Sequence, residues 1–169
     1  MYCNCNGYNL PLLRDNAKTK NKIKITSPRE LVENLREEIL NERGECLGIV
    51  ALDARNNVLW HGVIHIGTAN YCIAHPRDVF VPALLSNAVG VIIIHNHPSG
   101  EVTPSEEDIK VAREMNRVAE ILKIALLDFV IVSKDRYLSF SRNGLLNEEE
   151  KEENVKTKIN PESLKPSLN

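Results

Sequence analysis

The sequence contains no apolar run long enough to cross a membrane, because no stretch reaches the roughly 18 apolar residues that a membrane helix needs. Residues 1–13 also lack the basic start and the continuous apolar segment of an export signal. We therefore expect a cytoplasmic protein with no membrane partner.

Cysteine is scarce, with four residues in a chain of 169. That number is too small for a disulfide scaffold, so we interpret the cysteines as free thiols in a reducing compartment. Cys3 and Cys5 form a C-x-C pair, which leaves a metal clip open as an alternative. A second pair of matching ligands, as most structural zinc sites have, is missing.

An excess of one charge is also absent, since 21 Lys and Arg stand against 23 Asp and Glu, for a net charge of −2. No strong overall field favours nucleic acid, which argues against a role in coating DNA. The apolar fraction of 43% is sufficient for one compact domain. A chain of this length buries roughly two-thirds of its unfolded surface.

Neither internal repeats nor linkers divide the chain. Residues 1–25 carry five basic residues and one acidic residue without clear periodicity, which predicts a flexible basic arm. Weak contacts of this arm with phosphate groups stay open. From Glu148 the chain turns acidic and then polar, so 148–169 is predicted to be a disordered acidic tail. The folded domain is therefore predicted to span 26–147.

Three helices are predicted from capping signals and apolar periodicity. The first begins at the capping box of Ser27 and Glu30, has an apolar face that includes Leu31 and Leu40, and is ended by Gly44. A second helix spans about 76–87, although Pro82 inside it should kink or shorten it. The third begins at a capping box in Thr103-Pro104-Ser105-Glu106 and ends near Lys123.

The predicted strands form two hairpins and one central strand. Residues 45–53 and 58–66 flank a turn at Asn56-Asn57, and 125–133 and 137–141 flank a second turn. Residues 89–95, V-G-V-I-I-I-H, have too little polar alternation for a strand with a wet face. Interleaved strands and helices of this kind indicate an α/β or α+β domain with a mixed sheet.

Chemistry-bearing residues gather where the central strand ends. His95 and His97 are two apart, so in extended backbone both imidazoles face the same side. Ser105 and Asp108 are three apart and share a face of the following helix. Two imidazoles and one carboxylate leave the fourth tetrahedral position of Zn²⁺ open, as in catalytic zinc sites. Such a site also needs a carboxylate off the metal to move a proton.

This string, H-x-H-x₇-S-x₂-D with a glutamate at the start of an upstream strand, resembles the JAMM motif of the JAB/MPN+ metalloprotease superfamily. The blocks G-T-A-N-Y-C-I-A-H-P-R-D-V-F and H-N-H-P-S-G-E-V-T-P-S resemble its bacterial RadC-type branch. The resemblance covers about 26–147. It implies an α/β (α+β) fold, namely a curved mixed β-sheet flanked by helices with the layering of cytidine deaminases.

The resemblance also implies roles for five residues. His95, His97 and Asp108 would bind one Zn²⁺ per chain, and Glu45 would be the general acid/base. Ser105 would help to hold the oxyanion of the tetrahedral intermediate. The implied function is zinc-dependent hydrolysis of a peptide or isopeptide bond, and the implied partner is a peptide or an isopeptide-linked protein.

Other interpretations stay open. The chain can be a DNA-repair-associated RadC-like factor that binds or processes nucleic acid, or an inactive MPN-type module that binds a protein segment along a sheet edge. Asp108 can simply be a carboxylate favoured near a helix N-terminus, and Ser105 a favoured residue of the first helical turn. The oligomeric state is not indicated by the sequence.

The chain departs from the family pattern in three ways. We expect it to lack the N-terminal helix-hairpin-helix region that RadC-type proteins commonly carry. Phe129 stands where many relatives have histidine, and Pro82 interrupts a helix that usually lacks proline. None of these departures removes a predicted ligand, but they affect the expected shape of the substrate groove.

The remaining histidines are assigned structural places. His61 and His65 are predicted to share one face of their strand, which we interpret as an exposed sheet face rather than a second metal site. His75 precedes Pro76 and is expected to position a helix start. The loop around the paired histidines is expected to be shaped by Asn96, Pro98, Ser99 and Gly100.

Overall fold

The structure is a computed structural model that describes residues 23–40, 44–66 and 75–146, together with three short backbone strands at 2–5, 8–11 and 162–163. In chain order the helices are α1 (Pro28–Leu40), α2 (Pro76–Leu85) and α3 (Glu106–Leu122). The strands are β1 (Tyr2–Cys5), β2 (Tyr8–Pro11), β3 (Cys46–Leu52), β4 (Val58–Ile66), β5 (Gly90–Asn96), β6 (Ala125–Val132), β7 (Arg136–Ser139) and β8 (Glu162–Ser163).

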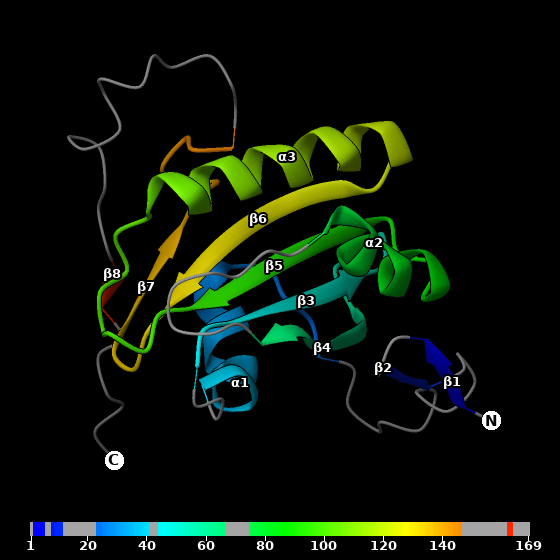
Figure 1. Ribbon diagram of the computed structural model, residues 1–169, viewed down its shortest axis with the longest axis horizontal. Helices are drawn as coiled ribbons and strands as arrows, with labels where there is room; N and C mark the ends of the chain where they lie inside the picture. Colours follow the sequence, from blue (N-terminus) through cyan, green and yellow to red (C-terminus); the bar gives the residue numbers. More distant parts are fainter. Residues whose placement is uncertain are drawn as a thin grey trace.

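The main sheet is mixed and has six strands in the order β4-β3-β5-β6-β7-β8 (Figure 1). β5 and β6 are parallel, and α3 connects them, whereas the other neighbours are antiparallel. Parallel neighbours require such a crossover, because a short turn cannot return the chain to the same end of the sheet. The two predicted hairpins are confirmed as β3–β4 and β6–β7.

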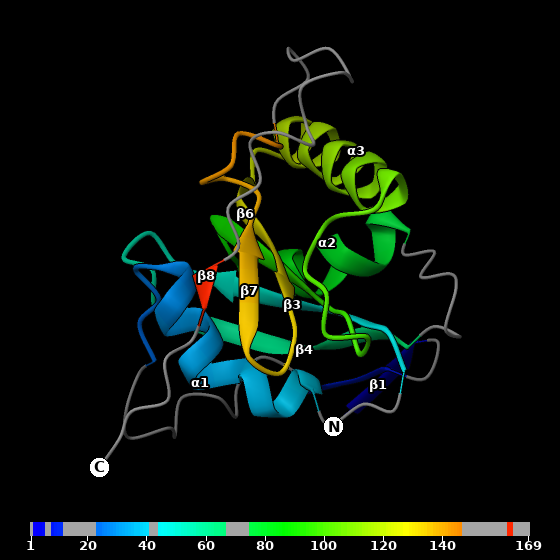
Figure 2. The same ribbon diagram turned by 90° about the vertical axis from the view of Figure 1, so that its left-hand side faces the viewer.

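The helices cover both faces of this sheet (Figure 2). One core, between the sheet and helices α2 and α3, contains Val79, Ile93, Met115 and Phe129. A second core, between the sheet and α1, contains Leu31, Leu35 and Ile94. Every residue of β5 is buried, as the continuous apolar run predicts for a strand covered on both sides. The α+β fold with a curved mixed sheet flanked by helices is therefore confirmed.

A carboxylate holds the turn between β3 and β4. Asp53 Oδ1 accepts hydrogen bonds from the backbone N–H groups of Arg55 and Asn57, at 2.8 and 2.9 Å. Asn56 adopts the left-handed conformation at φ +62°, which asparagine tolerates better than most residues. The predicted turn at Asn56-Asn57 thus closes the first hairpin.

The alternation of β4 is interrupted by a β-bulge. The ladder with β3 shifts beside Leu47, and Ile64 is the extra residue. His65 lies opposite Leu47, which belongs to the core under α2 and α3, whereas His61 lies opposite Val50, which belongs to the core over α1. The prediction that His61 and His65 share a face is therefore wrong, because a bulge reverses the alternation beyond it.

The last residues predicted for the basic arm pack on the domain. Ile25 is buried, and its backbone N–H donates to Asn56 O at 2.9 Å, while Val58 N donates to Ile23 O at 2.8 Å. The rest of the predicted arm and tail lies outside the described residues, apart from the paired strands β1 and β2 and the two residues of β8. Among the helices that the structure describes, none is both long and apolar enough to span a bilayer.

Helix α2 continues through Pro82 and ends at Leu85, two residues before the predicted end. The hydroxyl of Ser86 donates to the carbonyl oxygens of Pro82 and Ala83, at 2.8 and 3.0 Å, and so adds to the backbone hydrogen bonds that these oxygens accept from Ser86 N and Ala88 N. His75 is the N-cap residue of α2, as expected, but its side chain makes no capping hydrogen bond.

A buried carboxylate joins β6 to the segment after β7. Asp128 accepts hydrogen bonds from Ser139 Oγ at 2.5 Å, Ser141 N at 2.9 Å and its neighbour Phe129 N at 2.8 Å. Burial raises the pKa of Asp128, although these hydrogen bonds oppose the shift. The three donors fix the corner that follows the second hairpin.

Candidate metal centre

The loop after β5 presents two histidines at one end of the sheet. His95 is the second-last residue of β5, and His97 N extends the strand by donating to Val132 O at 2.8 Å. The chain then turns, with Gly100 N donating to His97 O at 3.1 Å. Gly100 has φ +91°, which a residue with a side chain rarely adopts, so the predicted need for glycine here is confirmed.

Main-chain oxygens orient both imidazole rings. His95 Nδ1 lies 3.0 Å from Cys46 O, and His97 Nδ1 lies 2.9 Å from Glu101 O. Because a carbonyl oxygen only accepts hydrogen bonds, each Nδ1 carries the proton, and each Nε2 keeps a free lone pair when the ring is neutral. Hydrogen bonds of this kind are what orient histidine ligands in metal sites.

Both Nε2 atoms point at one carboxylate. His95 Nε2 lies 3.4 Å from Asp108 Oδ1, and His97 Nε2 lies 3.5 Å from Asp108 Oδ2. The two rings are 4.8 Å apart between centroids and nearly perpendicular, at 89°. The end of β5 and the first turn of α3 thus bring together three residues that the sequence predicts as metal ligands.

The first turn of α3 is capped by residues of this same group. Ser105 is the N-cap: its Oγ accepts from Asp108 N at 3.1 Å and donates to Asp108 Oδ2 at 2.7 Å. Asp108 Oδ2 also accepts from Ser105 N at 2.7 Å. The capping box is therefore Ser105 with Asp108, and the prediction of a box formed by Thr103 and Glu106 is wrong, because the helix begins two residues later.

This packing changes the charge states of the three residues. Burial alone would raise the pKa of Asp108, but hydrogen bonds from His97 and Ser105 lower it to about 2. Burial lowers the pKa of His95, against the attraction of the Asp108 carboxylate. In His97 that attraction outweighs burial and raises the pKa. At neutral pH the group therefore contains one anionic carboxylate, Asp108, and one imidazole, His95, for which burial favours the neutral form.

Glu45 completes the group from a third element. It is half-buried and directly precedes β3. Ligand atoms of Glu45, His95 and His97 all lie within 4.8 Å of one another. Two carboxylates thus adjoin the imidazole pair: Asp108, fixed by the helix cap, and Glu45, fixed by the start of β3.

Phe129 lies in the core beneath the site. Its ring centroid is 6.5 Å from that of His95 and 4.8 Å from that of Phe140, and it is 1% exposed. The position at which the family resemblance leads one to expect histidine is therefore apolar here. It offers no titratable group to the imidazole pair.

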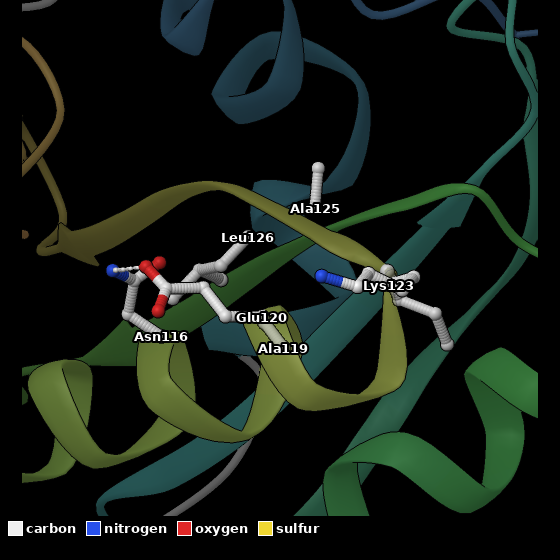
Figure 3. A pocket seen from close by; sticks show the side chains of 7 residues that line it. Asn116, Ala119, Glu120, Lys123, Ala125 and Leu126 are labelled. Atoms are coloured by element: carbon white, nitrogen blue, oxygen red, sulfur yellow. Dashed lines mark hydrogen bonds between the residues drawn. The ribbon is translucent and has the colours of Figure 1, made fainter.

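A shallow pocket lies elsewhere on α3 and does not belong to this group (Figure 3). Its volume is about 440 Å³, and it is lined by the last turns of α3 and the first residues of β6. Asn116, its lining residue nearest in sequence to Asp108, is eight positions along the helix, or about 12 Å at 1.5 Å per residue. The candidate metal centre is thus defined by the convergence of side chains at the end of β5 and not by this pocket.

The hydrogen-bond acceptors that orient the imidazole rings of His95 and His97 could not be predicted from the sequence. Cys46 and Glu101 contribute main-chain oxygens, which any residue type carries, so no side-chain motif encodes them. The only indirect signal is register, since Leu47 pairs with His95 and brings the start of β3 beside the histidine.

Comparison with known proteins matches residues 25–145 to the RadC-like JAB domain. A UPF0758 protein of Staphylococcus carnosus is 37% identical over 127 residues, which are 75% of this chain and 56% of that protein. A UPF0758 protein of Thermotoga maritima is 40% identical over 123 residues, which are 73% of this chain and 55% of that protein. The chain thus spans a little over half the length of these curated relatives.

Proposed function

The chain belongs to the RadC-like JAB domain family, and from this premise we propose that it is a zinc-dependent hydrolase that cleaves a peptide or isopeptide bond. The observation that carries the proposal is the convergence of His95 Nε2 and His97 Nε2 on the carboxylate of Asp108, at 3.4 and 3.5 Å. Glu45 lies beside the same imidazoles. Kinship of fold alone would not support an activity, because function depends on the site.

The donor set fits zinc. Two neutral imidazoles and one carboxylate are ligands that Zn²⁺ accepts in catalytic sites, and three protein ligands leave a further position for substrate or water. Both Nδ1 atoms are occupied by carbonyl oxygens, so each ring offers Nε2 only. Asp108 Oδ2 already accepts two hydrogen bonds from Ser105, which leaves Oδ1 as the more available oxygen.

When bound, the ion supplies Lewis acidity, which polarises a carbonyl group and makes water more acidic. His95, His97 and Asp108 would hold it. Their geometry is fixed before binding, because the rings are tied to main-chain oxygens and the carboxylate is tied to the helix cap. Such pre-organisation reduces the free-energy loss of ordering ligands.

We assign Glu45 the role of general acid/base, which moves the proton. A base that is not a ligand can take a proton from water and deliver it to the leaving amine. Glu45 comes from the start of β3, outside the helix cap that fixes Asp108, and its carboxylate adjoins both imidazoles. We assign Ser105 a place beside the oxyanion, in addition to the capping hydrogen bonds that it makes with Asp108.

The division between ligand and base is open to a direct test. If Glu45 were the third ligand instead of Asp108, Glu45→Gln would lose zinc together with activity. We expect Glu45→Gln to keep zinc and to lose activity by about 10²-fold or more, the range for general acid–base residues. Asp108→Asn should lose zinc, because the neutral amide is a weaker ligand and leaves the cap with one acceptor oxygen fewer.

The experiment for the activity is a chelator-sensitive screen of the zinc-loaded protein against quenched peptides and isopeptide-linked conjugates. Cleavage that a chelator abolishes, that zinc restores and that Glu45→Gln lacks would support the proposal. A fully zinc-loaded protein that cleaves nothing would contradict it and favour a binding module. Parallel titration with single-stranded and branched DNA at two salt concentrations tests the nucleic-acid alternative, because phosphate contacts weaken as salt rises.

A further inference from the structure

Asn96 lies between the two histidines of the site but faces the other side of the sheet. It is the last residue of β5 and pairs with Val132, which belongs to the core on the α1 side. Its side chain is almost completely buried, since the residue is 1% exposed. A buried carboxamide must find hydrogen-bond partners, so the identity of those partners indicates what Asn96 does.

Both ends of this carboxamide bind the main chain around Glu45. Asn96 Oδ1 accepts from Cys46 N at 2.5 Å, and Asn96 Nδ2 donates to Gly44 O at 3.1 Å. The partners determine which end is oxygen and which is nitrogen, because a backbone N–H only donates and a carbonyl oxygen only accepts. Asn96 is therefore bonded to the residue before Glu45 and to the residue after it.

These two contacts restrain the two peptide groups that flank Glu45. Gly44 O belongs to the planar group that ends at the Glu45 nitrogen, and Cys46 N belongs to the group that begins at the Glu45 carbonyl carbon. Rotation of Glu45 about φ would move the first group, and rotation about ψ would move the second. One side chain thus fixes both backbone dihedral angles of Glu45.

The ladder between β3 and β5 stops short of Glu45, although β4 still pairs Ile66 with Cys46. The described pairing of β3 with β5 ends at Leu47 and His95, and β3 itself begins at Cys46. Glu45 therefore precedes the strand, where the side chain of Asn96 takes the place of ladder hydrogen bonds. The same end of β5 binds Cys46 twice, since His95 Nδ1 also contacts Cys46 O.

We propose that Asn96 is a positioning residue, which clamps the main chain on both sides of Glu45 and so holds its carboxylate beside the two imidazoles. The inference rests on the proposed function in one respect, namely that Glu45 moves the proton. A proton carrier must be within hydrogen-bond reach of its target, and a displacement of about 1 Å can reduce the rate about 10²-fold.

The clamp can be tested without any substrate, in the metal-free protein, by NMR of the Glu45 and Cys46 amides. Asn96→Ala removes both contacts, so Cys46 N–H should exchange with solvent about tenfold faster relative to Ile93 N–H in the middle of β5. The order parameter of Glu45 N–H should fall from about 0.85 toward 0.6. Asn143→Ala is the matched control, because Asn143 Nδ2 also donates to a main-chain oxygen, Ser139 O, at 2.8 Å.

Asn96→Asp separates the two contacts. Its carboxylate still accepts from Cys46 N but has no hydrogen to donate to Gly44 O, so the Cys46 amide should stay protected while Glu45 N–H becomes more mobile. Comparison with Ile93 distinguishes this local effect from a general loss of stability, which would accelerate exchange at all three amides.

Kinetics of the zinc-loaded protein test the consequence for Glu45. Asn96→Ala should keep its zinc and lower kcat about 10²-fold with little change in KM. Adding Asn96→Ala to Glu45→Gln should cause no further loss, because a positioning residue has nothing left to position.

The outcomes separate this inference from the proposed function. Unchanged Glu45 and Cys46 amides in Asn96→Ala would overturn the clamp, and so would an altered amide pattern with wild-type kcat. Additive losses in the double variant would overturn it too. Absence of hydrolysis in the zinc-loaded wild type would instead refute the proposed function, and the amide measurements would still decide whether Asn96 clamps Glu45.

Discussion

Replacing Ser105 by alanine should weaken the domain and the metal site together. In the metal-free protein the change removes two capping contacts, the hydrogen bond from Asp108 N to Ser105 Oγ and the one from Ser105 Oγ to Asp108 Oδ2. The third contact, from Ser105 N to Asp108 Oδ2, is backbone and remains. Loss of an N-cap side chain typically lowers the free energy of unfolding by about 1 kcal/mol.

Two features of the site set the size of the effect. One of the lost hydrogen bonds is donated by the Ser105 hydroxyl to the Asp108 carboxylate, and hydrogen bonds to charged groups contribute about 1.5–3 kcal/mol. Ser105 is exposed, so water replaces part of that contribution. We therefore expect a loss of about 1–2 kcal/mol, which lowers Tm by roughly 3–10 °C for a domain of this size. Ser105→Thr keeps a hydroxyl and should stay within about 0.5 kcal/mol of the wild type.

Thermal unfolding in chelator at pH 7 measures this effect. Ser99→Ala is the matched control, because Ser99 lies in the same loop and its Oγ makes only a long contact, 3.4 Å, with Glu101 N. The control should differ from the wild type by less than about 0.5 kcal/mol. Equal losses in Ser99→Ala and Ser105→Ala would refute the reasoning.

The same substitution should weaken zinc binding about 10–100-fold, the usual effect of removing a partner that orients a metal ligand. Competition with a chromophoric chelator measures the affinity. A Ser105→Ala protein with reduced stability but wild-type zinc affinity would show that the cap does not orient Asp108 for the metal.

Other expected outcomes concern pH, burial and the loop. The pKa of Asp108 in the folded protein, about 2, lies below the ordinary value of 3.8, so its contribution to stability is present above about pH 4 and is lost as the pH falls toward 2. The free energy of unfolding of Asp108→Asn should therefore depend less on pH between 4 and 2 than that of the wild type. Zinc affinity should fall as the pH drops below neutral, first because the raised pKa of His97 lets this ring protonate early, and then at lower pH because His95, whose pKa burial lowers, is protonated later. A zinc affinity that does not change between about pH 7.5 and 5.5 would contradict this. Asp128→Ala should lower the free energy of unfolding by about 2–4 kcal/mol, because it leaves three hydrogen-bond donors unsatisfied. Asp128→Asn should cost less, and it should also remove the loss of stability that the raised pKa of Asp128 causes as the pH increases above 3.8. Equal unfolding midpoints of the two variants in urea would refute this. Gly100→Ala should lower stability by about 1 kcal/mol, because alanine is strained at φ +91°, and an unchanged Tm would argue against the turn.

Much of the fold follows from local sequence patterns. The apolar run of β5, the turn residues Asn56 and Asn57 and the spacing of apolar residues in α1 and α3 each have one dominant physical interpretation. They predict the central strand, the first hairpin and the helices. The mixed sheet follows because a helix connects the parallel strands β5 and β6, whereas a short turn connects the two antiparallel strands of each hairpin.

The structure differs from the predictions where tertiary contacts, and not local sequence, determine the conformation. The bulge at Ile64 is set by the pairing of β4 with β3, and pairing register is not a local property, so the faces of His61 and His65 could not be predicted. The start of α3 was predicted at a capping box of Thr103 and Glu106. The structure instead has Ser105 as the N-cap, in a box with Asp108.

The candidate site contains residues whose places follow from local sequence patterns and residues whose places depend on tertiary contacts. His95, His97, Ser105 and Asp108 are close in sequence, so their convergence could be predicted from one strand end and one helix start. The place of Glu45 depends on the register of β3 against β5 and came only from the family resemblance. The clamp by Asn96 was not predicted, because it requires a side chain to bind main-chain groups about 50 residues away in sequence.

The most direct measurement is the zinc content per chain, by elemental analysis after dialysis against a weak chelator, of the wild type, Glu45→Gln and His97→Ala. We predict about one zinc per chain for the wild type and for Glu45→Gln, and a large loss for His97→Ala. Full occupancy in His97→Ala, or an empty wild type after exposure to excess zinc, would contradict the assignment of this end of the sheet as a metal centre.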